Sequence, residues 1–89
     1  MESLNLPIEM ISLCALDGQL RPLRFRYEDE QHDLRVVRID EVLSANAVSY
    51  VGVQRYIYLC RAQYGGKQLV FELSYTVKTH SWTLSRFFT

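Results

Sequence analysis

The sequence predicts an all-β domain, an antiparallel meander of five or six strands that forms either a strongly bent sheet or a small SH3-like barrel. Alternation is the first observation. A charged residue follows each apolar residue from Leu23 to Glu28, and large apolar residues occupy the odd positions from Leu69 to Val77. Because side chains alternate between the two faces of a strand, each segment presents one apolar face. The second observation is that Asp17-Gly18 and Gly65-Gly66 stand between apolar runs, as in tight hairpin turns.

Length and composition indicate one domain over residues 1–89, with residues 1–5 disordered. A hydrophobic content of 48% is typical of a globular chain. Ten basic residues balance ten acidic ones, which argues against a chain built wholly around nucleic acid but is compatible with a local basic surface. No apolar run is long enough to cross a membrane, and the N-terminus lacks the pattern of a signal peptide. We therefore expect a cytoplasmic protein without membrane contact.

The first half of the chain is predicted to contain three strands. Residues 6–16 and the segment from Leu20 form a hairpin around Asp17-Gly18, and Pro22, which has no N–H to donate, predicts a sheet edge or a bulge. The polar residues 28–33 form the tip of a second hairpin that leads into a strand over residues 34–43. In that strand the apolar positions change phase, which indicates a β-bulge or a bend where the sheet curls.

The second half is predicted to contain a connection followed by three strands. Residues 44–52 form the connection, closed by Gly52, and a short helical turn capped by Ser44 or Asn46 is one option for it. Residues 54–64 form a central strand, because both of its faces carry apolar side chains. Residues 69–77 pair back onto it, and a turn at residues 78–81 leads to the last strand. The predicted core consists of Leu23, Phe25, Tyr27, Leu69, Phe71, Leu73, Tyr75, Trp82 and Leu84.

Several motifs extend over residues 7–88: Pro22–Glu30, Val36–Leu43, Tyr58–Arg61, Phe71–Tyr75 and Trp82–Leu84. Together they resemble a group of short uncharacterised proteins from Clostridia-type Firmicutes. The resemblance implies a free-standing bacterial cytoplasmic protein of this size and implies no activity. The chain departs from that group at Tyr50–Val53, where those proteins show a more helix-like polar stretch.

A second resemblance concerns the fold. The segment Arg55–Arg61, followed by Phe71–Leu73, looks similar to the aromatic strand and the following strand of WYL domains, which are SH3-like sensor modules of bacterial regulators. The Trp-Tyr-Leu triplet of that family is absent from this chain. The resemblance implies an SH3-like fold and no particular ligand.

The candidate metal ligands are two cysteines and two histidines, and no two of them have the short spacing that zinc sites favour. We expect neither a metal nor a cofactor. Cys14 and Cys60 each lie within an apolar run, so we interpret them as reduced, buried thiols that pack as small hydrophobic residues. A disulfide or a pair of reactive thiols is the alternative. His32 and His80 both fall in predicted turns, where a solvated histidine is the ordinary interpretation.

Candidate catalytic carboxylates are found at Asp40-Glu41 and Glu72. Acidic residues on strands are more typically paired with arginine across the sheet, and this chain is rich in arginine. The chain has no nucleophile-elbow pattern and no glycine-rich phosphate loop, since Gly65-Gly66 is a hairpin signal. The sequence therefore predicts a protein that is not an enzyme.

A nucleic-acid interface is one candidate function, because sheets that carry arginines and aromatic rings hold single strands in several folds. The residues of the candidate face, which a protein partner could also use, are Arg24, Arg26, Arg35, Arg61, Tyr56 and Tyr58. Acidic residues are interleaved with these arginines, and cross-strand ion pairs would explain both sets without a ligand. We therefore favour the interpretation that the arginines form ion pairs with carboxylates of the same chain, and we keep nucleic-acid binding as the alternative.

Self-association is the favoured function, because a small sheet with one apolar face and no covering helix exposes too much apolar surface. The C-terminal pair Phe87-Phe88 is the candidate contact. Adjacent residues of a strand point to opposite faces, so the two rings cannot both enter one core. We expect a homodimeric interaction module in which one of these rings is covered by the second copy.

Overall fold

The computed structural model describes residues 4–88 and shows the predicted all-β fold. Within these residues the chain forms seven strands and no helix, so no helix is present that could cross a membrane. The strands are β1 (Leu6–Cys14), β2 (Leu20–Glu28), β3 (Leu34–Arg38), β4 (Glu41–Tyr50), β5 (Val53–Tyr64), β6 (Lys67–Thr76) and β7 (Ser81–Phe87). Hairpin turns form at all four predicted places, between β1 and β2, β2 and β3, β5 and β6, and β6 and β7.

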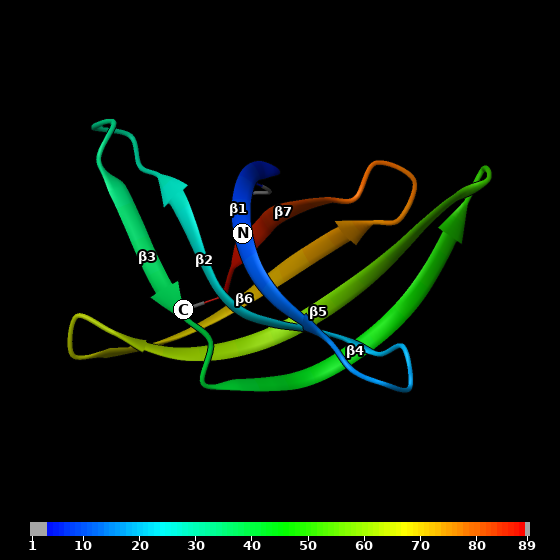
Figure 1. Ribbon diagram of the computed structural model, residues 1–89. Helices are drawn as coiled ribbons and strands as arrows, with labels where there is room; N and C mark the ends of the chain where they lie inside the picture. The colour runs from blue at the N-terminus through cyan, green and yellow to red at the C-terminus, as the bar shows by residue number, and fades with distance from the viewer. Residues whose placement is uncertain (1–3, 89) are drawn as a thin grey trace.

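The strands form one antiparallel sheet in the order β3-β2-β1-β7-β6-β5-β4. The sheet is strongly bent rather than closed into a barrel, and its two edges are β3 and β4 (Figure 1). β1 belongs to both halves of the bend: its first residues, Leu6–Ile8, pair with β7, and residues 9–14 pair with β2. The bend therefore brings the inner face of β2 and β3 against the inner face of β5, β6 and β7.

The chain crosses from one half of the bend to the other at Ile39 and Asp40. The Ile39 N–H donates to the Leu23 carbonyl of β2 at 2.9 Å, and the Asp40 N–H donates to the Arg61 carbonyl of β5 at 2.9 Å. The Asp40 carboxylate also accepts a hydrogen bond from the Gln63 N–H at 2.7 Å. The predicted strand over residues 34–43 is thus two strands, β3 and the start of β4, and the predicted bend at its phase change is confirmed.

The prediction of a connection over residues 44–52, with a helical turn as one option, is wrong. β4 runs on to Tyr50 and pairs with β5 from Glu41–Arg61 to Tyr50–Val53, with a bulge near Leu43. Small and polar side chains dominate this segment, so local propensity is weak, and the long β5 strand supplies hydrogen-bonding partners for its backbone. Gly52 does close the segment, as half of the two-residue turn Val51-Gly52.

The core lies between the two halves of the bend. Phe25 of β2 packs edge-on against Phe71 of β6, with ring centroids 5.4 Å apart. The fully or largely buried residues of this core are Phe25, Val37, Tyr58, Cys60, Ala62, Phe71, Leu73, Trp82 and Leu84. Tyr27, Leu69 and Tyr75 are partly buried against them. Eight of the nine predicted core residues therefore face the core.

Leu23 is the exception, and the prediction that it faces the core is wrong: its side chain is 39% exposed. Pro22 is paired with Ser12 and Arg24 with Ile11, so Leu23 is an extra residue in β2, a β-bulge. The bulge changes the phase of the strand, and Pro22 takes the buried position instead. The predicted edge or bulge at Pro22 is confirmed as a bulge.

The N-terminal residues 1–5 were expected to be disordered. Residues 1–3 lie outside the part of the chain that the structure describes. Leu4 and Asn5 are placed beside β7, and the Leu4 N–H donates to the Ser85 carbonyl at 2.7 Å.

The turn Val51-Gly52 generates a stability prediction. Both residues have positive φ, 51° at Val51 and 78° at Gly52, as a type I′ turn requires. A β-branched residue is strained in this region, whereas asparagine adopts it readily. Because Val51 is 83% exposed, its replacement loses little packing. We expect Val51→Asn to raise the free energy of unfolding by about 1 kcal/mol in urea denaturation.

Gly52→Ala is the matched control, because it adds a Cβ at the neighbouring positive-φ position, where no atom lies within 4 Å to clash with it. It should destabilise the protein by about 1 kcal/mol through backbone strain alone. A lower stability for Val51→Asn would show that the turn does not have this conformation in solution.

Candidate interaction surfaces

The outer face of β1, β2 and β3 carries arginine and aliphatic side chains together. Phe25 and Val37 are buried on the inner face, so the residues beside them in β2 and β3 point outward. Strand pairing places Ile11, Arg24 and Arg38 in one row across this face, and Glu9, Arg26 and Val36 in the next. We call this surface the arginine face; it comprises Arg21, Arg24, Arg26, Arg38, Glu9, Ile11, Leu13, Leu34 and Val36.

The aliphatic side chains of the arginine face are open to solvent. Ile11, Leu13, Leu34 and Val36 are between 49% and 58% exposed. A shallow hollow of about 420 Å³ lies over the middle of the face, and Ile11, Arg24, Arg26 and Val36 are among its lining residues. Arginine is enriched at protein contact surfaces, and contiguous exposed apolar groups mark such surfaces as well.

The arginines of this face differ in their partners. Arg26 donates from Nε to the Glu9 carboxylate at 3.0 Å. Arg24 and Arg38 lie directly opposite each other in neighbouring strands. Within residues 4–88, no carboxylate lies within ion-pair distance of either of these two arginines. Two like charges in facing positions repel each other, and an anion placed over them would remove that cost.

The structure does not bring the predicted arginine and tyrosine residues together on one face. Only Arg24 and Arg26 belong to the arginine face. Arg35 lies in β3 opposite Tyr27 and donates from Nε to Asp29 at 2.8 Å. Arg61 lies on the outer face of β5 and donates to the Glu41 carboxylate at 2.6 Å. Three of the four predicted arginines are thus paired with carboxylates, the arrangement that the sequence analysis favoured.

Tyr56 and Tyr58 point to the inner side of β5, away from Arg61. Tyr58 is 5% exposed, its hydroxyl donates to the Leu20 carbonyl at 2.9 Å, and burial raises the pKa of its phenol. Its ring lies 5.5 Å from that of Trp82. Tyr56 is stacked on Tyr75 with ring centroids 6.2 Å apart. Both tyrosines border a hollow of about 380 Å³ between the β1–β2 turn and β4.

The C-terminal aromatic pair separates as adjacent strand residues must. Phe87 packs inward, with its ring 6.2 Å from Phe71 and 6.3 Å from Tyr27. Phe88 is 38% exposed, and its N–H donates to the Val70 carbonyl at 2.7 Å. Phe88 is therefore the member of the pair that a second copy could contact.

Of the two cysteines, one is exposed. Cys60 is fully buried in the core, and this burial raises the pKa of its thiol to about 12. Cys14 is exposed at the end of β1, so its predicted burial is wrong. All four residues from Ile11 to Cys14 are exposed, so both faces of β1 are open at this end of the strand. Both cysteines are unpaired thiols.

The candidate catalytic carboxylates have structural partners. Glu41 pairs with Arg61, and Glu72 lies 3.6 Å from Arg86. His80 lies in the β6–β7 turn, and its Nδ1 shares a hydrogen bond of 2.9 Å with the Tyr75 hydroxyl of β6. Within residues 4–88, no group of three or more potential metal-ligating side chains lies together.

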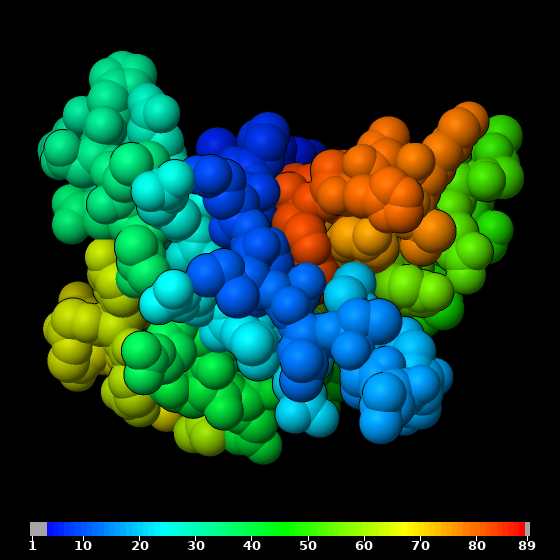
Figure 2. Space-filling view, in the orientation of Figure 1, coloured from blue at the N-terminus to red at the C-terminus, as the bar shows by residue number. Residues whose placement is uncertain are grey.

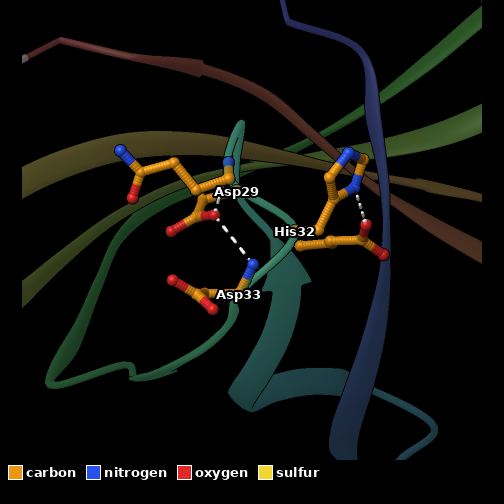
Figure 3. A network of polar contacts seen from close by, with 5 residues as sticks. Asp29, His32 and Asp33 are labelled. Atoms are coloured by element: carbon orange, nitrogen blue, oxygen red, sulfur yellow. Dashed lines mark hydrogen bonds and ion pairs between the residues drawn. The ribbon is translucent and has the colours of Figure 1, made fainter.

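The β2–β3 turn is organised by one carboxylate, that of Asp29 (Figure 3). Its Oδ1 accepts hydrogen bonds from the Asp33 and Gln31 N–H groups, both at 2.9 Å, and its Oδ2 accepts the bond from Arg35. The bond from Arg35, followed by the backbone bond from Asp33, lowers the pKa of Asp29 below its ordinary value of 3.8. His32 has a positive φ of 65° and lies 2.6 Å from the Glu28 carboxylate.

The sequence analysis did not predict that Arg38, Ile11, Leu13 and Val36 lie on one surface. Alternation assigned faces in β2 but not in β1 or β3, and only the register between strands places the four residues beside Arg24. The like-charged pair Arg24–Arg38 has no signature in the sequence, because the two residues are 14 positions apart in the chain and meet only through the β2–β3 pairing.

No family model, curated protein or solved structure matches this chain significantly. The resemblances to the Firmicutes group and to WYL domains stay predictions.

Asp29 gives a pH-dependent prediction. A carboxyl group with a lower pKa in the folded than in the unfolded state stabilises the fold above its unfolded pKa, and this contribution is lost as the pH falls through the folded pKa. Asn at this position can still accept the two backbone bonds but cannot accept from Arg35 through its NH₂ group. We expect Asp29→Asn to be less stable than the wild type at pH 7, with the difference shrinking below pH 3.8.

Thermal unfolding measured at several pH values between about 2 and 7 tests this expectation. Glu30→Gln makes the same chemical change one residue along the same turn, at an exposed side chain, and is the matched control. An equal loss of stability in both variants would contradict the role assigned to Asp29.

Proposed function

We propose that this protein is a small, non-catalytic interaction module that associates with itself. The observation that supports this function is the number of large apolar side chains that the bent sheet leaves exposed to solvent. The exposed side chains gather on the arginine face and on β4 with its turn; those of the second group are Leu43, Val48, Tyr50 and Val51. Apolar groups gathered in this way mark contact surfaces more often than free surfaces of a monomer.

The partners of the carboxylates support the non-catalytic part of the proposal. Asp40, Glu41 and Glu72 are each engaged by a backbone N–H or an arginine, as residues that hold strands in register would be. The proposed location is the cytoplasm, where two unpaired thiols would stay reduced.

Self-association predicts a solution mass of twice the 10.4 kDa monomer mass. We expect multi-angle light scattering at micromolar concentration to give that dimer mass, because hiding exposed apolar surface favours association. A monomer mass at the highest accessible concentration would contradict self-association and would mean that these apolar groups serve a different partner.

Nucleic-acid binding is the second candidate, and the facing pair Arg24 and Arg38 favours it. Guanidinium groups without a carboxylate partner bind phosphates bidentately, and the aliphatic groups beside them could contact bases. Tyr56 and Tyr58 are not available to such a ligand on this face. The proposed interface is therefore narrower than the one that the sequence suggested.

Salt dependence tests this candidate. If Arg24 and Arg38 both contact phosphates, the affinity for a labelled single-stranded oligonucleotide should fall about sevenfold between about 50 and 200 mM salt in anisotropy titrations. Arg24→Gln with Arg38→Gln should weaken binding, whereas Arg55→Gln, on the opposite half of the sheet, is the control. Absence of binding at low salt would remove this candidate.

A further inference from the structure

The strand β4 is an edge that the fold leaves unprotected. It pairs with β5 on one side and with no strand of the described chain on the other. Nine of its ten residues are exposed. The tip of the β4–β5 hairpin stands at one corner of the molecule beside the β6–β7 turn (Figure 2).

Strand register identifies the backbone groups on the open side of β4. In a two-residue hairpin, the residues that flank the turn exchange both of their hydrogen bonds, so Tyr50 and then every second residue before it bond to β5. The N–H and C=O groups of Ala45, Ala47 and Ser49 therefore point away from β5. None of these three residues makes a backbone hydrogen bond to a loop within residues 4–88.

β4 lacks the features that usually prevent edge strands from pairing with other chains. From Val42 to Gln54 the sequence contains no charged residue and no proline. The other edge, β3, is only five residues long, carries Arg35 and Arg38, and lies close to the end of β5. The two edges therefore differ: β3 is short and charged, whereas β4 is long and uncharged after Glu41, and the β1–β2 turn faces its middle residues only across a hollow of about 380 Å³.

Charge favours a second copy of the chain as the occupant of this edge. A two-fold contact through the arginine face would place arginines against their own copies, which like-charge repulsion disfavours. An antiparallel copy of β4 meets no like charge. It would also lie against the exposed apolar side chains at this edge, Leu43, Val48 and Tyr50, which are 44% to 78% exposed.

We infer that two copies of this protein pair through β4 in antiparallel orientation, so that one sheet continues from one copy into the other. This inference rests on the proposed self-association and names its surface. A two-fold axis beside Ala47 places Ala47 opposite the partner's Ala47 and Ala45 opposite the partner's Ser49. Because strand side chains project above and below the sheet, nothing at these positions keeps the two backbones from ordinary strand spacing.

The experiment combines solution mass with backbone amide exchange. In the wild type, the N–H groups of Ala45, Ala47 and Ser49 should exchange slowly at high concentration and faster on dilution. Ala47→Pro removes one outward N–H and leaves the bonds to β5 in place, so we expect a monomer mass with an unchanged far-ultraviolet circular dichroism spectrum. Leu16→Pro is the matched control, because Leu16 is fully exposed in the β1–β2 turn and proline suits that position. This variant should remain a dimer.

The outcomes separate this inference from the proposed function. A dimer that persists in Ala47→Pro, or fast exchange of the three amides in a wild-type dimer, would overturn pairing through β4 while self-association stands. Loss of the dimer in Phe88→Ser but not in Ala47→Pro would assign the contact to the C-terminus and also overturn the inference. A wild-type monomer would contradict both. If Ala47→Pro does not fold, the concentration dependence of amide exchange in the wild type decides.

Discussion

The crossing at Ile39 and Asp40 sets how the two halves of the sheet are placed against each other. One peptide unit links a residue bonded to β2 with a residue bonded to β5, so the chain leaves one half of the sheet and enters the other without a loop. The two halves must then face each other, and Phe25 and Phe71 meet in the space between them. The Leu23 bulge belongs to the same feature, because the carbonyl of that extra residue accepts the Ile39 N–H. Each of these contacts joins segments that are distant in sequence.

The same crossing produces the two surfaces that we connect with function. It sends β3 to one edge of the sheet and β4 to the other, although they are consecutive in the chain. β3 comes to lie near β5, whereas β4 extends beyond the fold with one side of its backbone open. Bending also turns the outer side of β1, β2 and β3 away from the core, which exposes aliphatic groups beside arginines. The protein thus presents a neutral edge, through which we propose that it self-associates, and a basic face, which is the second candidate interface.

Charge is balanced over the whole chain but not over its surface. Most of the arginines that attract attention in the sequence have acidic partners, as in the pairs Arg26–Glu9, Arg35–Asp29 and Arg61–Glu41. Exposed ion pairs contribute little to stability, so their main effect is to orient side chains and to neutralise charge locally. Arg24 and Arg38 differ from these arginines, because the strand register places the two residues opposite each other. A neutral net charge is therefore no guide to the behaviour of this face.

Features that depend on neighbouring residues were predictable from the amino-acid sequence. Alternation identified the inner faces of β2, β6 and β7, and glycines and polar clusters marked the hairpin turns, because strand period and turn geometry are local properties. Features that depend on pairing between distant segments were not predictable in this way. Leu23 lies outside the core because a bulge changes the phase of β2. Residues 44–50 form a strand because β5 supplies their hydrogen-bonding partners. The Arg24–Arg38 pair and the open edge of β4 exist only once the register and strand order are established, since neither is a property of any single segment.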